Sequence, residues 1–135
     1  MSEIVVFDSS VLIDQIRSNR HLSRILAIAG VVRNCSVVLA ELSRGATTAV
    51  DKKVVAALER AHPILTPTAN NWLESGHLLA EMRDDKGFEP AKLRSLHFDV
   101  LIALTARAYG AKVITSNRAD FELIREYREF KLEVW

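Results

Sequence analysis

The sequence has little cysteine and almost no net charge, and each scarcity limits what the protein can be. Of 135 residues, one is a cysteine, Cys35, so neither an internal disulfide nor a cysteine-based zinc cluster can form. Eighteen basic residues stand against seventeen acidic ones, so overall charge points to neither nucleic acid nor a membrane surface. These counts suit a reducing compartment, and we expect a cytoplasmic protein.

Long apolar segments are also absent from the sequence. The longest, around 25–32, is far shorter than the ~20 residues that cross a bilayer. The N-terminus carries Glu3 and Asp8 and lacks the pattern of a signal peptide. We found no repeat and no low-complexity tract. We therefore expect one domain over residues 1–135, with no membrane segment.

Short apolar strands alternate with longer helical patterns, which favours an α/β fold with a mainly parallel sheet of four to five strands. The expected strands are 4–7, 36–39, 111–115 and 132–135, with a short apolar piece at 64–65. The expected helices are 11–16 capped by Ser9 or Ser10, 22–28 ending at Gly30, 50–61, 72–82, 101–109 and 118–127, with a helical turn before Gly45 and a loop at 83–90.

Three acidic residues stand out because they lie in apolar surroundings. Asp8 directly follows the first strand, Glu41 lies in "VVLAELSRG", and Asp99 lies in "HFDVLIALTA" at the start of an apolar helix. A lone carboxylate in such a context is costly unless something pairs with it. Sites in parallel α/β sheets gather beyond the carboxyl ends of the strands, and Asp8 lies at such an end.

A fourth acid, Asp120 in "VITSNRADF", is expected at the same edge of the sheet. Thr115 and Ser116 end a strand and Asn117 opens a helix, so Asp120 falls in the first turn of that helix. Carboxylates that converge there repel one another, and Mg²⁺ or Mn²⁺, which prefer oxygen ligands, would remove the conflict. Such a cation can activate a water molecule and stabilise a phosphoryl transition state.

Each acid also has an ordinary structural explanation. Asp8 can be a turn or cap residue, and Asp99 can cap its helix. Glu41 can pair with Arg44 along a helix. Asn117 and the acid three positions later have the spacing of a capping pair. Taken singly, the acids therefore leave a metal site and plain structural roles both open.

A basic stretch follows the first helix. No acid occurs between Asp14 and Glu41, whereas His21 and four arginines fall there: Arg17, Arg20, Arg24 and Arg33. Arginine contacts to phosphate supply affinity without base specificity. The stretch is therefore a candidate RNA-binding or partner-binding face, with a solvated helix surface as the alternative.

The motifs "FDSSVLID", "VVLAELSRG" and "HFDVLIALTARAYGAKVITSNRADF" together resemble, in order and spacing, those of PIN-domain ribonucleases. The nearest group is the VapC-type toxins of type II toxin–antitoxin systems. The resemblance covers nearly the full length, and its last segment is the most specific. It implies a three-layer α/β/α fold and a magnesium- or manganese-dependent endoribonuclease. It also implies a homodimer and a small antitoxin partner that inserts an apolar and basic segment near the acidic site.

The resemblance also implies roles for particular residues. The acids that resemble the family's catalytic and metal-binding positions are Asp8, Glu41, Asp99 and the more variable Asp120. Ser10, Thr115 and Asn117 resemble supporting polar residues. Some family members carry an acid where this chain has Asn117, which leaves Asp120 as the acid of that segment. The implied hydrolysis uses water rather than the ribose 2′-hydroxyl and leaves a 5′-phosphate.

Other classes of protein fit the sequence less well. A PIN nuclease of RNA processing or decay remains an alternative to a toxin, and a non-catalytic PIN scaffold would have lost acids that this chain keeps. A phospho-receiver domain needs an acidic pair after the first strand and a lysine after a late one, but Asp8 stands alone and "VITSN" has no lysine. A haloacid-dehalogenase-type phosphatase needs a second aspartate where Ser10 stands.

Overall fold

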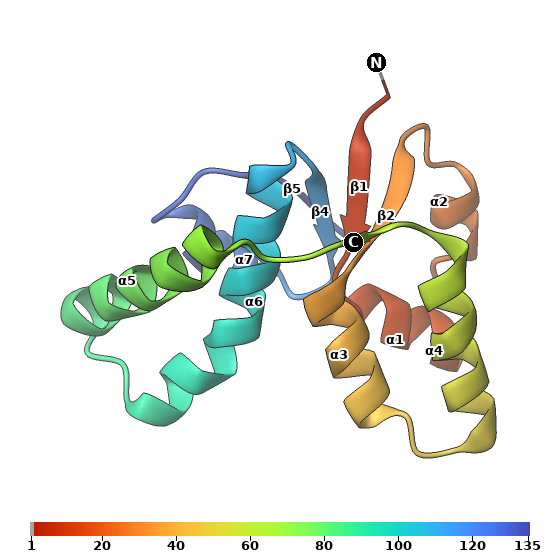
Figure 1. The fold of residues 1–135 in the computed structure, drawn as a ribbon, viewed down its shortest axis with the longest axis horizontal. Helices are drawn as coiled ribbons and strands as arrows, with labels where there is room; N and C mark the ends of the chain where they lie inside the picture. The colour runs from red at the N-terminus through yellow and green to blue at the C-terminus, as the bar shows by residue number, and fades with distance from the viewer. Residues whose placement is uncertain (1) are drawn as a thin grey trace.

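The computed structural model describes residues 2–135, and a five-stranded sheet lies at its centre (Figure 1). The strands are β1 (Ile4–Phe7), β2 (Val31–Cys35), β3 (Ile64–Leu65), β4 (Lys112–Thr115) and β5 (Lys131–Val134). They run in the spatial order β3-β2-β1-β4-β5, and every pair is parallel. This confirms the expected α/β fold with a mainly parallel sheet of four to five strands.

Within the described residues, seven helices connect and cover the strands. They are α1 (Ser9–Ser18), α2 (Leu22–Leu26), α3 (Ser36–Gly45), α4 (Ala49–Ala61), α5 (Ala69–Lys86), α6 (Pro90–Ala108) and α7 (Arg118–Arg125). In Figure 1, α1, α2 and α4 lie on one side of the sheet and α5, α6 and α7 on the other. The result is the three-layer α/β/α arrangement that the family resemblance implies.

Alternation along the strands divides the apolar core between the two faces of the sheet. Val6 and Val113 pack into the larger cluster, which also holds the buried apolar residues of α5, α6 and α7. Val5, Phe7 and Ile114 point the other way and pack with Val11 of α1. Because both faces of these strands are covered, β1 is apolar throughout and β4 is apolar at its two central positions, Val113 and Ile114.

The register of the two central strands brings their carboxyl ends together. Phe7 of β1 pairs with Ile114 of β4, and the Asp8 amide donates to the Ile114 carbonyl at 2.9 Å. Asp8, which follows β1, and Thr115, the last residue of β4, are therefore placed beside each other. The predicted convergence of polar residues at this edge follows directly from the pairing.

The prediction of a strand at 36–39 is wrong, and the second strand instead spans residues 31–35. Residue 36 opens α3, in which Val37, Val38, Leu39 and Leu42 are buried. Val37 and Val38 are β-branched and favour a strand locally, but pairing of β2 with β1 uses the preceding residues. Tertiary pairing thus overrides local preference in this segment.

The prediction that a helix ends at Gly30 is wrong, because α2 already ends at Leu26. Gly30 lies where the chain enters β2, and a Cβ atom there would stand 2.5 Å from the Glu3 carbonyl oxygen. The Val31 amide donates to that same oxygen at 2.7 Å. The absence of a side chain therefore allows β1 and β2 to approach at their first residues.

The expected loop at 83–90 is reduced to three residues, 87–89. Helix α5 continues to Lys86 and ends at Gly87, whose φ of 68° is in the left-handed region that favours glycine. Helix α6 starts at Pro90, a residue suited to the first turn, rather than at 101. Asp99 therefore lies in the middle of α6, and the interpretation of Asp99 as a helix cap is wrong.

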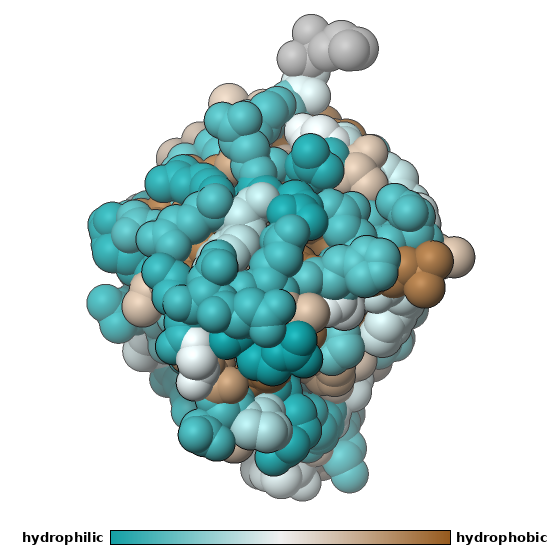
Figure 2. All heavy atoms as spheres, turned by 90° about the vertical axis from the view of Figure 1, so that its left-hand side faces the viewer, coloured by the Kyte–Doolittle hydropathy of each residue, from teal (hydrophilic) through white to brown (hydrophobic). Residues whose placement is uncertain are grey.

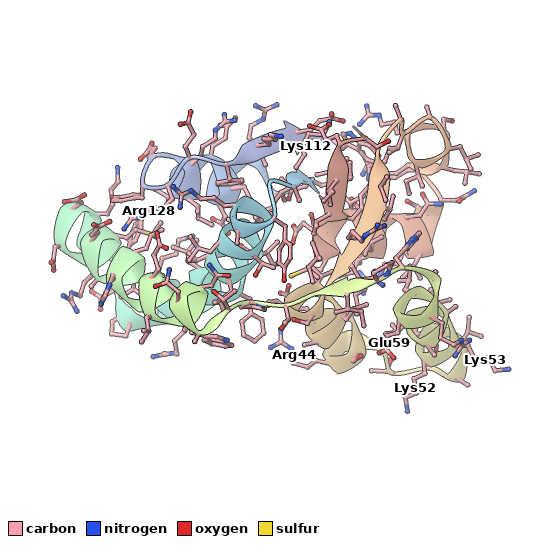
Figure 3. The ribbon with its side chains drawn as sticks, turned by 45° about the horizontal axis from the view of Figure 1, so that its top comes forward. Arg44, Lys52, Lys53, Glu59, Lys112 and Arg128 are labelled. Carbon is pink, nitrogen blue, oxygen red and sulfur yellow. The ribbon has the colours of Figure 1, made fainter. Side chains whose placement is uncertain are left out.

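Ion pairs fix the outer helix α5 to the segment after α7. Arg128, labelled in Figure 3, donates to Glu74 at 2.8 Å and to Glu81 at 3.2 Å. The side of the molecule that shows α5 is mostly hydrophilic in Figure 2. In residues 2–135, no helix is both long enough and apolar enough to cross a membrane.

We expect Gly30→Ala to lower the free energy of unfolding by ~1–3 kcal/mol, because the new methyl group would push the Glu3 carbonyl away from β2. Gly76→Ala is the matched control, since nothing lies within 4 Å of a Cβ atom there. In the interior of α5 this control should be neutral or slightly stabilising. Urea unfolding of the three proteins measures both effects, and equal stability of Gly30→Ala and wild type would contradict the role of Gly30.

Candidate functional site

Asp8 is the anchored member of the site. It follows β1 and occupies the N-cap position of α1, but its side chain makes no capping hydrogen bond. Its Oδ2 atom instead accepts hydrogen bonds from Ser10 Oγ at 2.7 Å and Thr115 Oγ1 at 2.8 Å. Asp8 is only 2% exposed, so both hydroxyls compensate for the burial of its carboxylate. The interpretation of Asp8 as a plain cap is therefore wrong.

The supporting hydroxyls are themselves held by the backbone after β4. Ser10 Oγ accepts from the Ser116 amide at 3.0 Å, and Thr115 Oγ1 accepts from the Asn117 amide at 2.9 Å. Ser10 and Thr115 thus lie where the sequence predicts, against Asp8. The chain of contacts from α1 to the start of α7 fixes the orientation of the Asp8 carboxylate.

Glu41 reaches the same place from α3, and Ser9 lies between the two acids. The Ser9 hydroxyl donates to Glu41 Oε1 at 3.3 Å and lies 3.5 Å from Asp8 Oδ1. Ser9 was expected to cap the first helix, and this is wrong because Ser9 lies inside α1. The hydroxyl pair after Asp8 in "FDSS" was the available signal, but it did not show which serine would contact which acid.

Asp99 completes the group from the middle of α6. Oxygen atoms of Asp8, Glu41 and Asp99 all lie within 4.8 Å of one another. Asp99 is 9% exposed and has no hydrogen-bond or ion-pair partner among residues 2–135. Three elements, β1, α3 and α6, therefore deliver three carboxylates to one small volume, as the apolar context of each acid predicts.

The electrostatics of the group follow from burial and like charge. Burial, followed by the negative charges of Asp8 and Glu41, raises the pKa of Asp99 to about 8. Burial, followed by the charge of Asp8, also raises the pKa of Glu41. The charge of Arg44, labelled in Figure 3, opposes this effect on Glu41, and its guanidinium lies 5.5 Å from the centre of the Phe98 ring. Within residues 2–135 Glu41 and Arg44 form no ion pair or hydrogen bond, so the Glu41–Arg44 pair considered from the sequence is not a direct contact.

Asp120 lies near this group but outside it. Asn117 Nδ2 donates to Asp120 Oδ2 at 3.1 Å, and Lys92 Nζ donates to Asp120 Oδ1 at 3.2 Å. The Asn117 side chain also accepts from the Asp120 amide at the start of α7. The capping-pair interpretation of these two residues is thus confirmed. Lys92 was missed by the sequence analysis, because nothing in its local sequence distinguishes it from other surface lysines.

The four arginines of the basic stretch have different surroundings. Arg20 lies 4.0 Å from Asp14, Arg24 stacks over Trp135 at 5.6 Å, and Arg33 donates to its neighbouring carbonyl. Of the four, Arg17 alone borders the acidic group, in a hollow of about 90 Å³ that Glu41 also lines. An RNA-binding or partner-binding role for these arginines stays a prediction.

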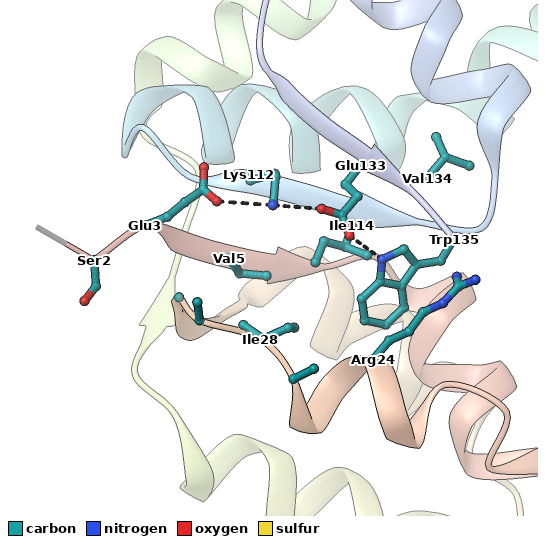
Figure 4. Close-up of a pocket in the computed structure, with 13 residues that line it drawn as sticks. Ser2, Glu3, Val5, Arg24, Ile28, Lys112, Ile114, Glu133, Val134 and Trp135 are labelled. Atoms are coloured by element: carbon teal, nitrogen blue, oxygen red, sulfur yellow. Dashed lines mark hydrogen bonds and ion pairs between the residues drawn. The ribbon is translucent and has the colours of Figure 1, made fainter.

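A larger hollow lies away from the acids, over the β1–β4–β5 face (Figure 4). Its volume is about 860 Å³, and Arg24, Lys112 and Trp135 are among its lining residues. Lys112 is already neutralised there by Glu133 at 2.8 Å and Glu3 at 3.2 Å. Since Glu3, Lys112 and Glu133 are paired with one another and Arg24 stacks on Trp135, size alone does not make this hollow the functional site.

Carboxylates gathered at the carboxyl edge of a parallel sheet define a class of α/β domains whose site suits a hard divalent cation. A family model described as the PIN domain matches residues 5–127, so the chain belongs to the PIN-domain family. The membership of the PIN-domain family that the sequence motifs indicated is thereby confirmed.

Solved structures of low sequence identity share the fold. The chain is similar to one in DNA-bound VapBC from Salmonella typhimurium, with 23% identity, coverage of 100% of this chain and 99% of that one, and a TM-score of 0.74. It is also similar to a chain in VapBC2 from Rickettsia felis bound to a promoter DNA fragment, with 22% identity, coverage of 98% of both chains and a TM-score of 0.73. A chain in VapBC-5 from Mycobacterium tuberculosis has 22% identity, coverage of 98% of both chains and a TM-score of 0.66. No curated protein matches this sequence.

The raised pKa of Asp99 predicts a pH-dependent stability. The unfolded chain releases this proton near the ordinary value of 3.8, whereas the folded chain keeps it until about pH 8. In that range the folded state binds more protons, so stability should fall as pH rises, by up to ~1.4 kcal/mol per pH unit from this group. A divalent cation needs the ionised form, so Mg²⁺ should raise the melting temperature more at pH 8 than near pH 6.

Thermal melts with and without MgCl₂ at the two pH values measure this effect. Asp99→Asn removes the group with the largest shift, so it should flatten the pH slope, to which Glu41 still contributes, and abolish the Mg²⁺ shift. Asp84→Asn is the matched control, because Asp84 is exposed and pairs only with Arg83. If Mg²⁺ raises the melting temperature of the wild type equally at both pH values, Asp99 is not the group that couples cation binding to proton release.

Proposed function

We propose that this chain is a magnesium- or manganese-dependent endoribonuclease and the toxin of a VapBC-type toxin–antitoxin pair. The observation that carries the proposal is the group formed by Asp8, Glu41 and Asp99, whose oxygen atoms lie within 4.8 Å of one another in a chain of the PIN-domain family. Without a counter-charge, such a group has a high electrostatic cost. A cost of this kind favours a functional role over a structural one.

The donor set fits Mg²⁺ or Mn²⁺. All three side chains offer carboxylate oxygens, which these cations prefer, and no nitrogen or sulfur ligand belongs to the group. Both hydrogen bonds to Asp8 within 3 Å fall on Oδ2, which leaves Oδ1 to face a cation. When bound, the cation would lower the pKa of a water molecule and stabilise negative charge at the phosphate.

The side chains of the site then have two further roles, which are to orient Asp8 and to activate the attacking water. Ser10 and Thr115 hold Asp8 in one orientation through Oδ2. Glu41 receives the Ser9 hydroxyl on Oε1, so its Oε2 atom is left to orient the attacking water and accept its proton. Burial raises the pKa of Glu41, which makes it a better proton acceptor than an ordinary carboxylate. In-line attack by that water leaves a 5′-phosphate.

The proposed partner is a small antitoxin with an apolar and basic segment. The similar structures named above are described as VapBC complexes. Beside the acids, the hollow of about 90 Å³ combines apolar walls from Ile13, Ile16 and Val55 with the carboxylates of Glu41 and Asp51. This surface suits an apolar side chain followed by a basic one. We further propose a homodimer that acts in the cytoplasm.

Cleavage of a panel of structured RNAs with Mg²⁺ tests the nuclease. We expect Asp8→Asn and Asp99→Asn each to lower the cleavage rate by at least about 100-fold, because each removes a proposed cation ligand. Asp84→Asn, on the exposed side of α5, should cleave like wild type. If Asp8→Asn and Asp99→Asn cleave as fast as wild type, the site assignment is wrong.

Expression in a bacterial host tests the toxin separately. We expect the wild type to arrest growth and Asp8→Asn, expressed to the same soluble level, to relieve the arrest. Asp84→Asn should remain toxic. Unaffected growth with a wild-type protein that cleaves RNA in vitro would overturn the toxin and favour a nuclease of RNA processing or decay.

A further inference from the structure

Lys92 occupies the Asp120 side of the acidic site. It lies on α6 seven positions before Asp99, which places both residues on the same face of that helix, two turns apart. Its Nζ atom donates to Asp120 Oδ1 at 3.2 Å, and its positive charge opposes the increase in the pKa of Asp99. Lys92 therefore acts electrostatically on two of the four predicted acids.

Both oxygens of Asp120 already have donors from this chain. Lys92 holds Oδ1, and the Asn117 side chain donates to Oδ2 at 3.1 Å. A divalent cation bound at Asp120 would have to displace the Lys92 ammonium. The other three acids differ, because no lysine or arginine lies within ion-pair distance of Asp8, Glu41 or Asp99 in residues 2–135.

The Lys92–Asp120 pair does not have the character of a structural ion pair. The Lys92 side chain is 42% exposed and Asp120 is 24% exposed, and pairs this accessible add little to stability. The exposure leaves part of the ammonium free for another anion. Four carboxylates and one divalent cation retain negative charge, which opposes the approach of a phosphodiester, and Lys92 reduces that charge.

We propose that Lys92 supplies the positive charge that a second divalent cation would otherwise supply, so that this chain holds one cation per site and contacts the RNA phosphate at the cleavage position through Lys92. Asp120 then anchors the ammonium instead of a metal. The contact with RNA rests on the proposed nuclease function, whereas the number of cations does not.

Mn²⁺ binding, counted by electron paramagnetic resonance, separates this role from a merely structural one. We expect one Mn²⁺ in the wild type. Lys92→Met removes a neighbouring positive charge, so it should bind the first Mn²⁺ about three- to tenfold more tightly and gain a second ion at Asp120. Adding Asp120→Asn to Lys92→Met should return the count to one.

Cleavage should change in the opposite direction to metal binding. At saturating Mn²⁺ we expect Lys92→Met to cleave RNA at least about tenfold more slowly, because a charge-assisted contact to the phosphate is lost. Lys92→Arg keeps the charge and should retain one Mn²⁺ and most of the activity. Lys86→Met is the matched control, since Lys86 is also 42% exposed and pairs with Glu126 away from the site.

Two results would overturn the role of Lys92: two Mn²⁺ ions in the wild type, or a Lys92→Met protein that binds Mn²⁺ as Lys86→Met does. If either occurs while wild type cleaves RNA, the nuclease proposal stands and the Lys92 inference fails. If the Mn²⁺ counts change as described but wild type cleaves no RNA, the nuclease proposal fails and Lys92 remains the built-in cation of the site.

Discussion

Mutual repulsion among three carboxylates, two buried and one half-buried, is the constraint on which the site depends. Asp8, Glu41 and Asp99 come from a strand end and two helices, with oxygens within 4.8 Å of one another. The fold holds them together through interactions elsewhere, because the acids themselves do not attract. These interactions include the parallel pairing of β1 with β4 and with β2, and the close approach of β2 to β1 at Gly30. Packing energy from the core thus maintains an arrangement that is locally unfavourable.

Much of the sheet edge could be predicted from the sequence, because functional residues of parallel α/β sheets gather at the carboxyl ends of the strands, and an acid directly after an apolar strand lies at such an end. Asp8 directly follows β1 and Thr115 is the last residue of β4, so the register alone brings them together. The position of β2 could not be predicted in this way. Val37 and Val38 have the β-branched character of a strand, and only their burial within α3 against distant residues makes the helix preferable.

Contacts between side chains far apart in the sequence were the least predictable. The motif around Asp99 indicated an acid in an apolar helix, but α6 begins nine residues earlier than Asp99, so that acid lies well inside the helix. Lys92 meets Asp120 across 28 positions, and no local pattern marks such a contact. The four arginines form a group in the sequence but meet different partners, because α1, α2 and β2 all fall within that stretch.

The three acids differ in how far the protein itself compensates their burial. Asp8 has two hydroxyl donors and lies beside the N-terminus of α1, whose dipole favours negative charge. Glu41 has the Ser9 hydroxyl. Asp99 has no donor within residues 2–135 and lies far from either end of its helix, which is why burial raises the pKa of this acid to about 8. A cation bound at this group would therefore stabilise Asp99 most, and its binding would be coupled to release of the Asp99 proton.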